Sequence, residues 1–226
     1  MAIREKIARR ARKAGLSLQP PLTDSLASYF DLLKRWNQKV SLTALPLADE
    51  GEEALDRLLI EPLLAARFIR PAGAVVIDVG SGGGSPAIPM KLACPGIALR
   101  MVESKTRKAA FLREATRQLG LTDTAIEPHR LEELLIRPEL HEGTDVVTIR
   151  AVRTEKKLLT GVQMLLKPGG LLFLFRSGDA HMDNAISGEF LELESSHTLL
   201  PHLQTRLTVF RNVPRGTLVT TTGESK

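Results

Sequence analysis

An apolar run that ends in a cluster of glycines occupies residues 74–84: Ala74-Val75-Val76-Ile77-Asp78-Val79-Gly80-Ser81-Gly82-Gly83-Gly84. A nearly continuous apolar run of this length is typical of a parallel strand that is buried on both faces. Gly80 and Gly82 let the backbone turn tightly and come close to a ligand, because a Cβ at either position would occupy the ligand's space. The run therefore predicts a central strand whose carboxyl end carries a binding loop.

Strand and helix patterns alternate after this run. Further strands are expected at 97–102, 124–127, 144–148 and 171–175. Helices are expected from about Ala87, over 105–119 and over 155–166. Two more strand-like runs, 189–194 and 203–211, have little helical pattern between them and predict an antiparallel pair. The chain is therefore predicted to have an α/β fold, a doubly wound and mostly parallel sheet with an antiparallel C-terminal strand.

The first 70 residues show helical patterns. Gly15 and the pair Pro20-Pro21 break a first helix, and Thr23 or Asp24 is expected to cap a second one. Apolar residues at three- and four-residue steps follow, and Trp36 falls among them. A third helix is expected over 52–68, with a kink or a late start at Pro62. We therefore divide the chain into an N-terminal helical extension, residues 1–70, and a Rossmann-like domain, residues 71–226.

Composition limits the class of protein. The 226 residues are 43% hydrophobic and 25% charged, as in an ordinary globular chain. The single cysteine, Cys94, cannot form an internal disulfide, and the histidines have no zinc-ligand spacing. No stretch has the composition of a signal peptide or the length of a membrane span. These features predict a cytoplasmic protein without a metal ion or a membrane partner, and we expect a monomer.

Positive charge is concentrated at the amino-terminal end. The net charge is +5, from 31 basic and 26 acidic residues. Within residues 1–13 six basic residues face only one acidic residue, so the rest of the chain is balanced. The six are Arg4, Lys6, Arg9, Arg10, Arg12 and Lys13. This basic arm is predicted to bind nucleic-acid phosphates, although it also fits an anionic membrane surface or a helix that only faces solvent.

A carboxylate follows the second strand. Glu103 ends the run Leu99-Arg100-Met101-Val102, so it is expected at the same sheet edge as the glycine loop, where it can accept hydrogen bonds from ribose hydroxyls. This pairing indicates an adenosine-containing ligand. Dinucleotide-binding loops require a third glycine or alanine where this chain has Ser85, so the spacing favours S-adenosylmethionine over a dinucleotide. A shifted frame that ends at Ala87 fits a dinucleotide loop but contains Pro86.

The chain resembles one known family over most of its length. The matching motifs are Trp36-Asn37, Ser41-Leu42-Thr43, Asp78 to Pro89, Val102-Glu103-Ser104, Arg107-Lys108, Phe111-Leu112, Arg130-Leu131-Glu132 and Arg150-Ala151-Val152. The family is the bacterial small-subunit (16S) ribosomal RNA guanine-N7 methyltransferases, also called the glucose-inhibited division protein B family. The glycine loop is generic, whereas the Pro-x-Ile-Pro extension at 86–89 and the Arg-Ala pair are specific.

This resemblance implies a class I methyltransferase sheet with a helical extension, and methylation of N7 of a guanine in 16S ribosomal RNA. It implies that S-adenosyl-L-methionine is contacted by Gly80, Ser85, Leu131, Glu132 and Arg150. Gly80 and Ser85 would hold the methionine end, Leu131-Glu132 would border the adenine, and Arg150 would have a positioning role near the reaction centre. With the loop and strand reasoning above, the predicted cofactor site is Gly80, Gly82, Gly84, Ser85, Glu103, Leu131, Glu132 and Arg150.

The chemistry fits the residues beside the loop. Guanine N7 carries a lone pair and no proton, so its methylation needs no general base, and no obvious base lies next to the glycines. Catalysis would then rest on alignment of the two reactants. The roles of two further features stay open. Trp36 is either a core residue or a platform for a base, and the basic stretch at 105–117 is either an RNA-binding face or solvated charge.

The chain departs from the family's usual pattern at a small set of positions: Ser41, Leu58, Ser85, Ala87 and Arg176. The resemblance places these residues in the helical extension or near the substrate entrance. Two alternatives therefore remain beside a 16S ribosomal RNA methyltransferase. One is a paralogue that acts on another RNA position or on a small molecule. The other is a ribosome-binding factor that has lost efficient catalysis.

Overall fold

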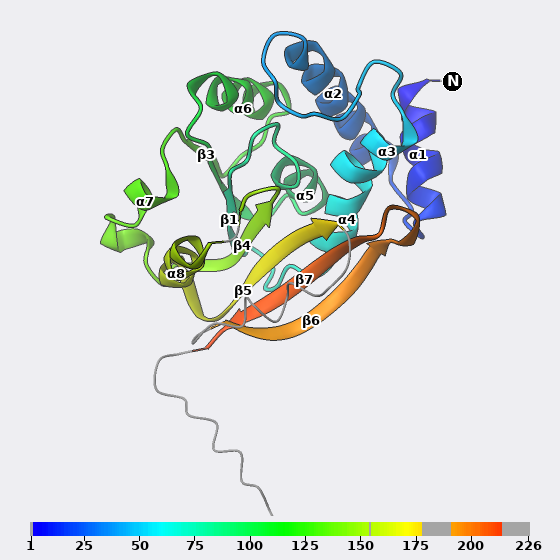
Figure 1. The fold of residues 1–226 in the computed structure, drawn as a ribbon. Helices are drawn as coiled ribbons and strands as arrows, with labels where there is room; N and C mark the ends of the chain where they lie inside the picture. Colours follow the sequence, from blue (N-terminus) through cyan, green and yellow to red (C-terminus); the bar gives the residue numbers. More distant parts are fainter. Residues whose placement is uncertain (1, 154, 178–190, 214–226) are drawn as a thin grey trace, which may run out of the picture.

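The central feature of the fold is a mixed, seven-stranded β-sheet (Figure 1). The computed structural model describes residues 2–153, 155–177 and 191–213. Met1 of the basic arm and residues 189–190 of the predicted strand at 189–194 lie outside the described residues. The strands are β1 (Val75–Val79), β2 (Ala98–Val102), β3 (Thr124–Glu127), β4 (Thr144–Arg150), β5 (Leu166–Ser177), β6 (Leu191–Leu200) and β7 (Thr205–Asn212).

The strand order β3-β2-β1-β4-β5-β7-β6 confirms the predicted fold class. β1 pairs in parallel with β2 on one side and with β4 on the other, and β5 continues the parallel set. β7 is antiparallel to both β5 and β6, so the last two strands form the predicted antiparallel pair. The chain order reverses between β1 and β4. A reversal of this kind opens a crevice at the carboxyl ends of the strands, where doubly wound proteins bind ligands.

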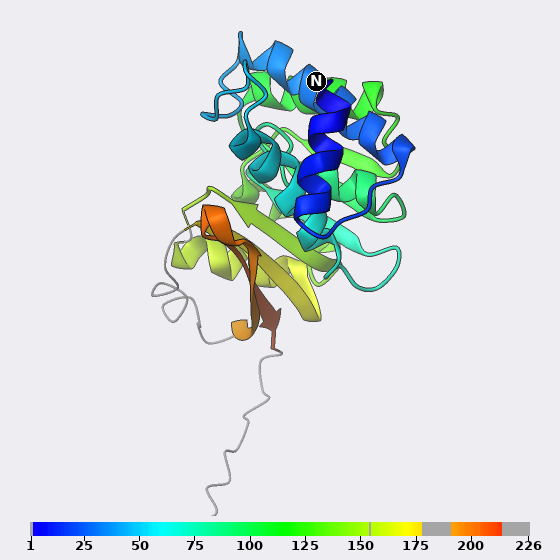
Figure 2. The same ribbon diagram turned by 90° about the vertical axis from the view of Figure 1, so that its right-hand side faces the viewer.

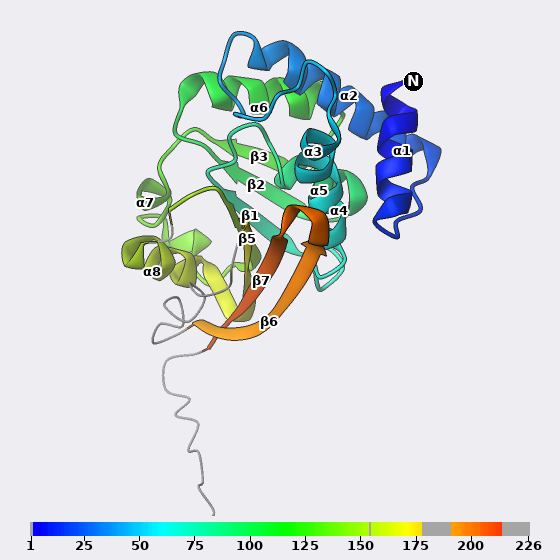
Figure 3. The ribbon, with the colours of Figure 1, turned by 45° about the vertical axis from the view of Figure 1, so that its right-hand side comes forward.

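Helices cover both faces of the sheet. They are α1 (Ile3–Lys13), α2 (Pro20–Asn37), α3 (Glu52–Leu55), the π-helix η1 (Asp56–Ile60), α4 (Glu61–Ala66), α5 (Ala87–Ala93), α6 (Thr106–Gln118), α7 (Leu131–Leu134), the 3-10 turn η2 (Pro138–Leu140), α8 (Lys156–Leu165) and the 3-10 turn η4 (Pro201–Leu203). Figure 3 shows α7 and α8 on one side of the sheet and α2, α5 and α6 on the other. None of the helices in the described part of the chain is long and apolar enough to cross a membrane.

Alternating side chains of the strands supply two hydrophobic clusters. Val76 and Met101 belong to the cluster that contains the residues of α1 to α6, whereas Ile77 and Val79 belong to the cluster under α7 and α8. This alternation follows from the two-residue period of a strand. Because both faces are covered, the strands read as apolar runs, and each fully buried aliphatic side chain contributes about 1.5–3 kcal/mol.

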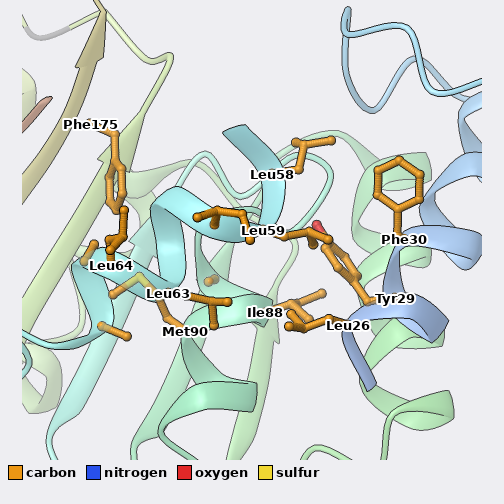
Figure 4. Close-up of a cluster of buried hydrophobic side chains, with 14 of the residues drawn as sticks. Leu26, Tyr29, Phe30, Leu58, Leu59, Leu63, Leu64, Ile88, Met90 and Phe175 are labelled. Carbon is orange, nitrogen blue, oxygen red and sulfur yellow. The ribbon is translucent and has the colours of Figure 1, made fainter. Parts of the chain in front are cut away.

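The helical extension packs against the sheet helices. Leu59 of η1 and Ile88 of α5 lie in the same cluster as Leu26 and Tyr29 of α2 (Figure 4). Helix α1 is on the outer side of this layer, nearest the viewer in Figure 2. Buried residues from both sides of position 70 therefore share one cluster. The division into parts 1–70 and 71–226 remains a prediction.

Two predicted helix boundaries are wrong. Helix α2 begins at Pro20, with Gln19 as its N-cap, and not after Thr23 or Asp24. Proline is tolerated in a first helical turn, because its missing N–H has no intrahelical partner there. The predicted helix at 52–68 is divided into α3, η1 and α4, and Pro62 is the second residue of α4. Helical backbone continues from Glu52 through η1 into α4, so a late start at Pro62 is wrong, and the π-helix η1 directly before α4 is the local change in the helix.

Candidate active site

The glycine loop turns sharply at the carboxyl end of β1. Gly80 has a φ of +76°, a conformation that L side chains rarely adopt, and a Cβ added there would lie 2.6 Å from Cγ2 of Val152. The N–H groups of Gly80 and Ser81 donate to the carbonyl of Val102, at 2.9 and 3.1 Å. Only glycine therefore fits at position 80, where the loop passes between the ends of β2 and β4.

Glu103 holds the loop from the end of β2. Its Oε2 accepts a hydrogen bond from the N–H of Gly82 at 2.9 Å, and its Oε1 accepts one from the N–H of Lys105 at 2.7 Å. The side chain is buried, yet it borders two cavities. Each carboxylate oxygen has a second lone pair, so Glu103 retains acceptor capacity for the hydroxyls of a ribose.

Two neighbouring cavities meet at the loop, with volumes of about 670 and 400 Å³. Both are bordered by Gly80, Glu103 and Val152. Cavities of this size are typical of small-molecule sites. The larger cavity extends toward the loop at 42–45, helix α3 and η1, and the smaller one toward the start of α7. The carboxyl edge of the sheet therefore offers two connected places for ligand groups, one on each side of Val152.

The predicted cofactor residues are distributed over the two cavities. Gly82, Ser85 and Arg150 line the larger cavity, whereas Leu131 and Glu132, at the start of α7, line the smaller one. Gly84 lines neither cavity. A Cβ at Gly84 would lie 2.5 Å from Cδ1 of Ile88, so glycine is required there for packing inside the protein. The structure therefore gives no support to a cofactor contact by Gly84.

Arg150 contacts several groups around the larger cavity. Its Nη2 donates to Oε2 of Glu61 at 2.8 Å, and its Nη1 donates to the carbonyl of Arg57 and to Oγ of Ser85 at 3.4 Å. The guanidinium also lies over the ring of Phe175, 5.7 Å from the ring centre. Burial lowers the pKa of Arg150 and the Glu61 carboxylate raises it. Arginine stays charged under all ordinary conditions, so the pair is an ion pair.

Glu61 was not predicted as a site residue. It is 2% exposed at the start of α4 and lines the larger cavity. Burial raises the pKa of its carboxyl, whereas Arg150 and the hydroxyl of Thr205 lower it. In the sequence Glu61 is notable only because it lies three residues after Leu58, one of the departures from the family pattern. No sequence signal joins it to Arg150, which is 89 positions away.

The π-helix presents backbone carbonyls to this network. The carbonyl of Arg57 accepts from Arg150, and the carbonyl of Leu58 accepts from Oγ of Ser85 at 2.9 Å. Both carbonyls belong to η1, whose wider turn interrupts the ordinary helical ladder. π-Helical turns are frequent at functional sites. The short helix that precedes α4 therefore fixes both Arg150 and Ser85.

Two polar residues of α2 hold the loops around the larger cavity. The hydroxyl of Tyr29, the only tyrosine of the chain, donates to the carbonyl of Gly83 at 2.7 Å. Tyr29 is fully buried, and burial raises its pKa, so the hydroxyl remains a donor. Oδ1 of Asn37 accepts from the N–H groups of Leu42 and Thr43, at 2.8 and 3.0 Å. Only Asn37 had a sequence signal, the Trp36-Asn37 motif.

The basic arm is largely paired within the protein. Arg10 is 5% exposed and donates to Asp56 and Glu52, so the prediction that Arg10 contacts RNA is wrong. The other ion pairs of the arm are Arg4 with Asp24, Lys6 with Glu50 and Arg9 with Glu52. Among the described residues, Arg12 and Lys13 have no such partner. The sequence shows an excess of positive charge in the arm because the acidic residues that pair with the arm lie beyond residue 13.

Solved structures with a similar fold include methyltransferases. A protein described as a predicted O-methyltransferase from Agrobacterium tumefaciens matches with a TM-score of 0.59 and 13% identity, over 70% of this chain and 82% of that one. The cyclase SpnF matches with a TM-score of 0.60 and 14% identity, over 82% and 94%. At such identities the likeness concerns the fold alone, and a fold does not determine a reaction. The fold and the glycine loop define a protein of the class I methyltransferase architecture.

Sequence relatives identify the family. Residues 22–205 match the model of the family described as rRNA small subunit methyltransferase G, GidB. Proteins named ribosomal RNA small subunit methyltransferase G are similar to this chain. The one from Stenotrophomonas maltophilia is 35% identical over 172 residues, 76% of this chain and 77% of the relative. The one from Acetivibrio thermocellus is 30% identical over 193 residues, 85% and 78%. The chain belongs to the rRNA small subunit methyltransferase G family, which confirms the resemblance found in its sequence.

Most of the departures from the family pattern surround one cavity. Leu58, Ser85 and Arg176 all line the larger cavity. Ala87 is buried in α5, and Ser41 is exposed before the loop at 42–45. The departures therefore concern the larger cavity more than the smaller one.

Proposed function

We propose that this protein transfers a methyl group from S-adenosyl-L-methionine to N7 of a guanine in 16S ribosomal RNA. The observation that carries the proposal is the pair of cavities joined at Gly80, Glu103 and Val152, at the point where the strand order reverses. A site that binds both substrates at once needs a cavity for the methyl donor and an adjoining cavity for the base that accepts the methyl group. Family membership supports the same reaction and substrate. We also infer a cytoplasmic location, which a ribosomal RNA substrate supports.

The smaller cavity fits the adenosine part of the donor. The Glu103 carboxylate would accept hydrogen bonds from the ribose hydroxyls, and Leu131, 7% exposed, offers an apolar contact for the adenine beside Glu132. The backbone at Gly80, Gly82 and Ser85 would hold the methionine end, where the cofactor crosses into the larger cavity. When bound, this cofactor supplies an electrophilic methyl group on a sulfonium.

The larger cavity then holds the guanine in line with the methyl group. The N7 lone pair forms the new bond to carbon, the carbon–sulfur bond breaks, and its electron pair stays on sulfur. No proton moves, so the protein acts by aligning the guanine with the methyl group. In well-oriented reactions such alignment lowers the activation barrier by about 7–11 kcal/mol. The base becomes cationic, and the Glu61 carboxylate in the wall of the cavity would favour that charge.

Arg150 acts in this scheme as a positioning residue. Its donors already serve Glu61, Ser85 and the carbonyl of Arg57, so it ties the end of β4 to the helical wall of the cavity. Replacement by lysine would keep the charge but lose the forked geometry. We propose that Arg150 acts by holding Glu61 and Ser85 in place, and not by touching the reacting atoms.

The test is transfer of radiolabelled methyl from S-adenosylmethionine to purified ribosomal particles. Unmethylated 30S subunits, free 16S ribosomal RNA and 50S subunits are incubated with the protein, and the product nucleoside is identified by chromatography. Incorporation into 16S ribosomal RNA as 7-methylguanosine supports the proposal. Transfer to the 50S subunit alone, or to another atom, would identify a paralogue with a different target. RNA binding without transfer in any arm would identify a non-catalytic factor.

A further inference from the structure

A second basic surface lies beside the proposed active site. The C-terminal half of α2 and helix α6 run side by side (Figures 1 and 3). Between them is a groove of about 510 Å³, whose rim carries Arg35, Lys39, Arg107 and Gln118 and whose wall includes Trp36. We call it the α2/α6 groove. None of these residues belongs to the basic arm in which RNA binding was predicted.

The cations of this surface form no hydrogen bond or ion pair with described residues, although Arg35 lies close enough to Glu114 to help Arg117 lower the pKa of that carboxyl. In the described part of the chain, six lysine and arginine side chains at the end of α2 and around the start of α6 make no hydrogen bond or ion pair: Arg35, Lys39, Lys105, Arg107, Lys108 and Arg113. Two acidic residues are near. Glu114 is already bound by Arg117 and Gln118, and Asp31 lies one turn before Arg35 on α2. The surface therefore keeps a clear positive excess.

This arrangement contrasts with α1, whose arginines and lysines mostly pair with carboxylates across the fold. Arg35 is in the last turn of α2, and Lys39 follows two residues after the helix ends at Asn37. Both side chains are exposed and line the α2/α6 groove. A bound polyanion would neutralise their charge.

An aromatic ring forms part of the groove wall. Trp36 is half-buried and packs edge-on against Phe111 of α6, with ring centres 5.8 Å apart. The contact joins the two helices and fixes the groove between them. Apolar Leu32 and Val40 complete the wall. An apolar, aromatic wall below a cationic rim is the arrangement that suits a nucleotide chain, whose phosphates are charged and whose bases stack.

The groove is continuous with the proposed active site through the first turn of α6. Lys108 lines the larger cavity, one residue after Arg107 on the groove rim. Lys105, which precedes α6, donates its backbone N–H to Glu103. We propose that the α2/α6 groove binds the phosphate backbone of the RNA next to the guanine that enters the larger cavity. This inference rests on the proposed function for the identity of the nucleic acid.

The test compares two triple variants that remove equal charge. The groove variant carries Arg35→Ala, Lys39→Ala and Arg107→Ala. The control variant carries Arg67→Ala, Arg70→Ala and Lys156→Ala, three exposed cations outside both the groove and the basic arm that form no ion pair in the described residues. A fluorescein-labelled fragment of 16S ribosomal RNA is titrated with each protein, and the dissociation constant is measured by fluorescence anisotropy at several salt concentrations.

The groove variant is expected to bind at least about tenfold more weakly than wild type, and its slope of log affinity against log salt should fall by about two to three. The control variant should stay within about threefold of wild type, with a slope change below about one. Equal losses in both variants would mean that only total charge matters, and a groove variant that binds like wild type would overturn the inference directly.

Two further readouts separate this inference from the proposed function. S-adenosylmethionine affinity by calorimetry should be the same in wild type and both variants, which also shows that the variants fold. In methyl transfer, the groove variant should have a raised KM for RNA and an unchanged kcat. Groove-dependent RNA binding without methyl transfer by wild type would refute the proposed function alone. Normal methyl transfer with an unchanged KM in the groove variant would refute the groove alone.

Discussion

At the scale of single residues, Gly80 is the position where geometry allows the least variation. Its φ of +76° is strained for any L side chain, and Cγ2 of Val152 lies 2.6 Å from the place of a Cβ. Gly80→Ala is therefore expected to lower the free energy of unfolding by about 1–3 kcal/mol and to weaken S-adenosylmethionine binding. Urea denaturation and calorimetry measure the two effects.

The control for this prediction is Gly96→Ala. A Cβ at Gly96 meets nothing within 4 Å, and its φ is not in the left-handed region, so stability should change by less than about 0.5 kcal/mol. The double variant Gly80→Ala with Val152→Ala removes the clash but keeps the unfavourable φ, and should recover only part of the loss. Wild-type stability and affinity in Gly80→Ala would show that the loop is not held as described.

Asp78, at the end of β1, makes stability depend on pH. Burial raises its pKa to about 6, although the hydrogen bond that the Thr148 hydroxyl donates to its Oδ1 opposes the shift. The folded protein therefore holds this proton more tightly than the unfolded chain, whose carboxyl has an ordinary pKa of 3.8. The free energy of unfolding should fall as pH rises from about 4 to about 6, by on the order of 2–3 kcal/mol from this group.

Asp78→Asn should remove that part of the pH profile. Urea denaturation between about pH 4 and 7 is compared for wild type, Asp78→Asn and the exposed control Asp31→Asn. The difference between wild type and Asp78→Asn should grow in favour of the variant as pH rises. A constant difference across this range would mean that Asp78 does not titrate there.

At the scale of secondary-structure elements, Arg10 joins three segments that are distant in the sequence. From α1 it donates to Asp56 of η1, and Asp56 also contacts His202 of η4, with Nε2 and Oδ2 2.8 Å apart. Both Arg10 and Asp56 are buried. Loss of one partner of a buried ion pair leaves the other charge unpaired, so Arg10→Ala should lower the free energy of unfolding by about 3–5 kcal/mol.

The matched control is Arg12→Ala, two positions away on the same helix. Arg12 is exposed and has no partner in the described residues, so its loss should change stability by less than about 0.5 kcal/mol. The same urea measurement on Arg10→Ala with Asp56→Ala should show a cost smaller than the sum of the single changes. Equal small effects at positions 10 and 12 would contradict the buried pair.

The accuracy of sequence-based prediction followed the strength of the local signal. β3 was predicted at its observed limits, and α6 within one residue at each end, because apolar periodicity alone defines them. β5 extends from Leu166 to Ser177, well beyond the predicted 171–175, because Leu166 pairs with Thr144 of β4 and β7 pairs with β5 as far as Ser177. The four-residue helix α7 is too short to show a period. Pairing partners and short helices are set by tertiary contacts that local patterns do not contain.

At the scale of the whole molecule, the glycine loop and Glu103 were predictable because each directly follows a strand, and strand ends meet at one sheet edge. The Glu61–Arg150 pair and the contact of Tyr29 with the loop were not, because they join α4 and α2 to the sheet across long sequence distances. Arg10 was misassigned for the same reason. Its charge was visible in the sequence, whereas the carboxylates that neutralise it were not yet placed beside it.

The two cavities also differ in how closely their residues follow the family pattern. The smaller one is bordered by residues that match the family motifs, and the larger one by the departures at Leu58, Ser85 and Arg176. We therefore expect the cofactor side of the site to behave as in the family, whereas the surroundings of the guanine that accepts the methyl group differ in shape and hydrogen bonding.

The most direct test of the central claim is titration calorimetry of the protein with S-adenosylmethionine. We expect wild type to bind with a dissociation constant in the micromolar range. Glu103→Gln should bind at least about tenfold more weakly, since a hydrogen bond to a charged group contributes about 1.5–3 kcal/mol. The exposed control Glu139→Gln should bind like wild type. Absence of binding by folded wild type, or equal binding by Glu103→Gln, would contradict the assignment of the glycine loop and Glu103 as the cofactor site.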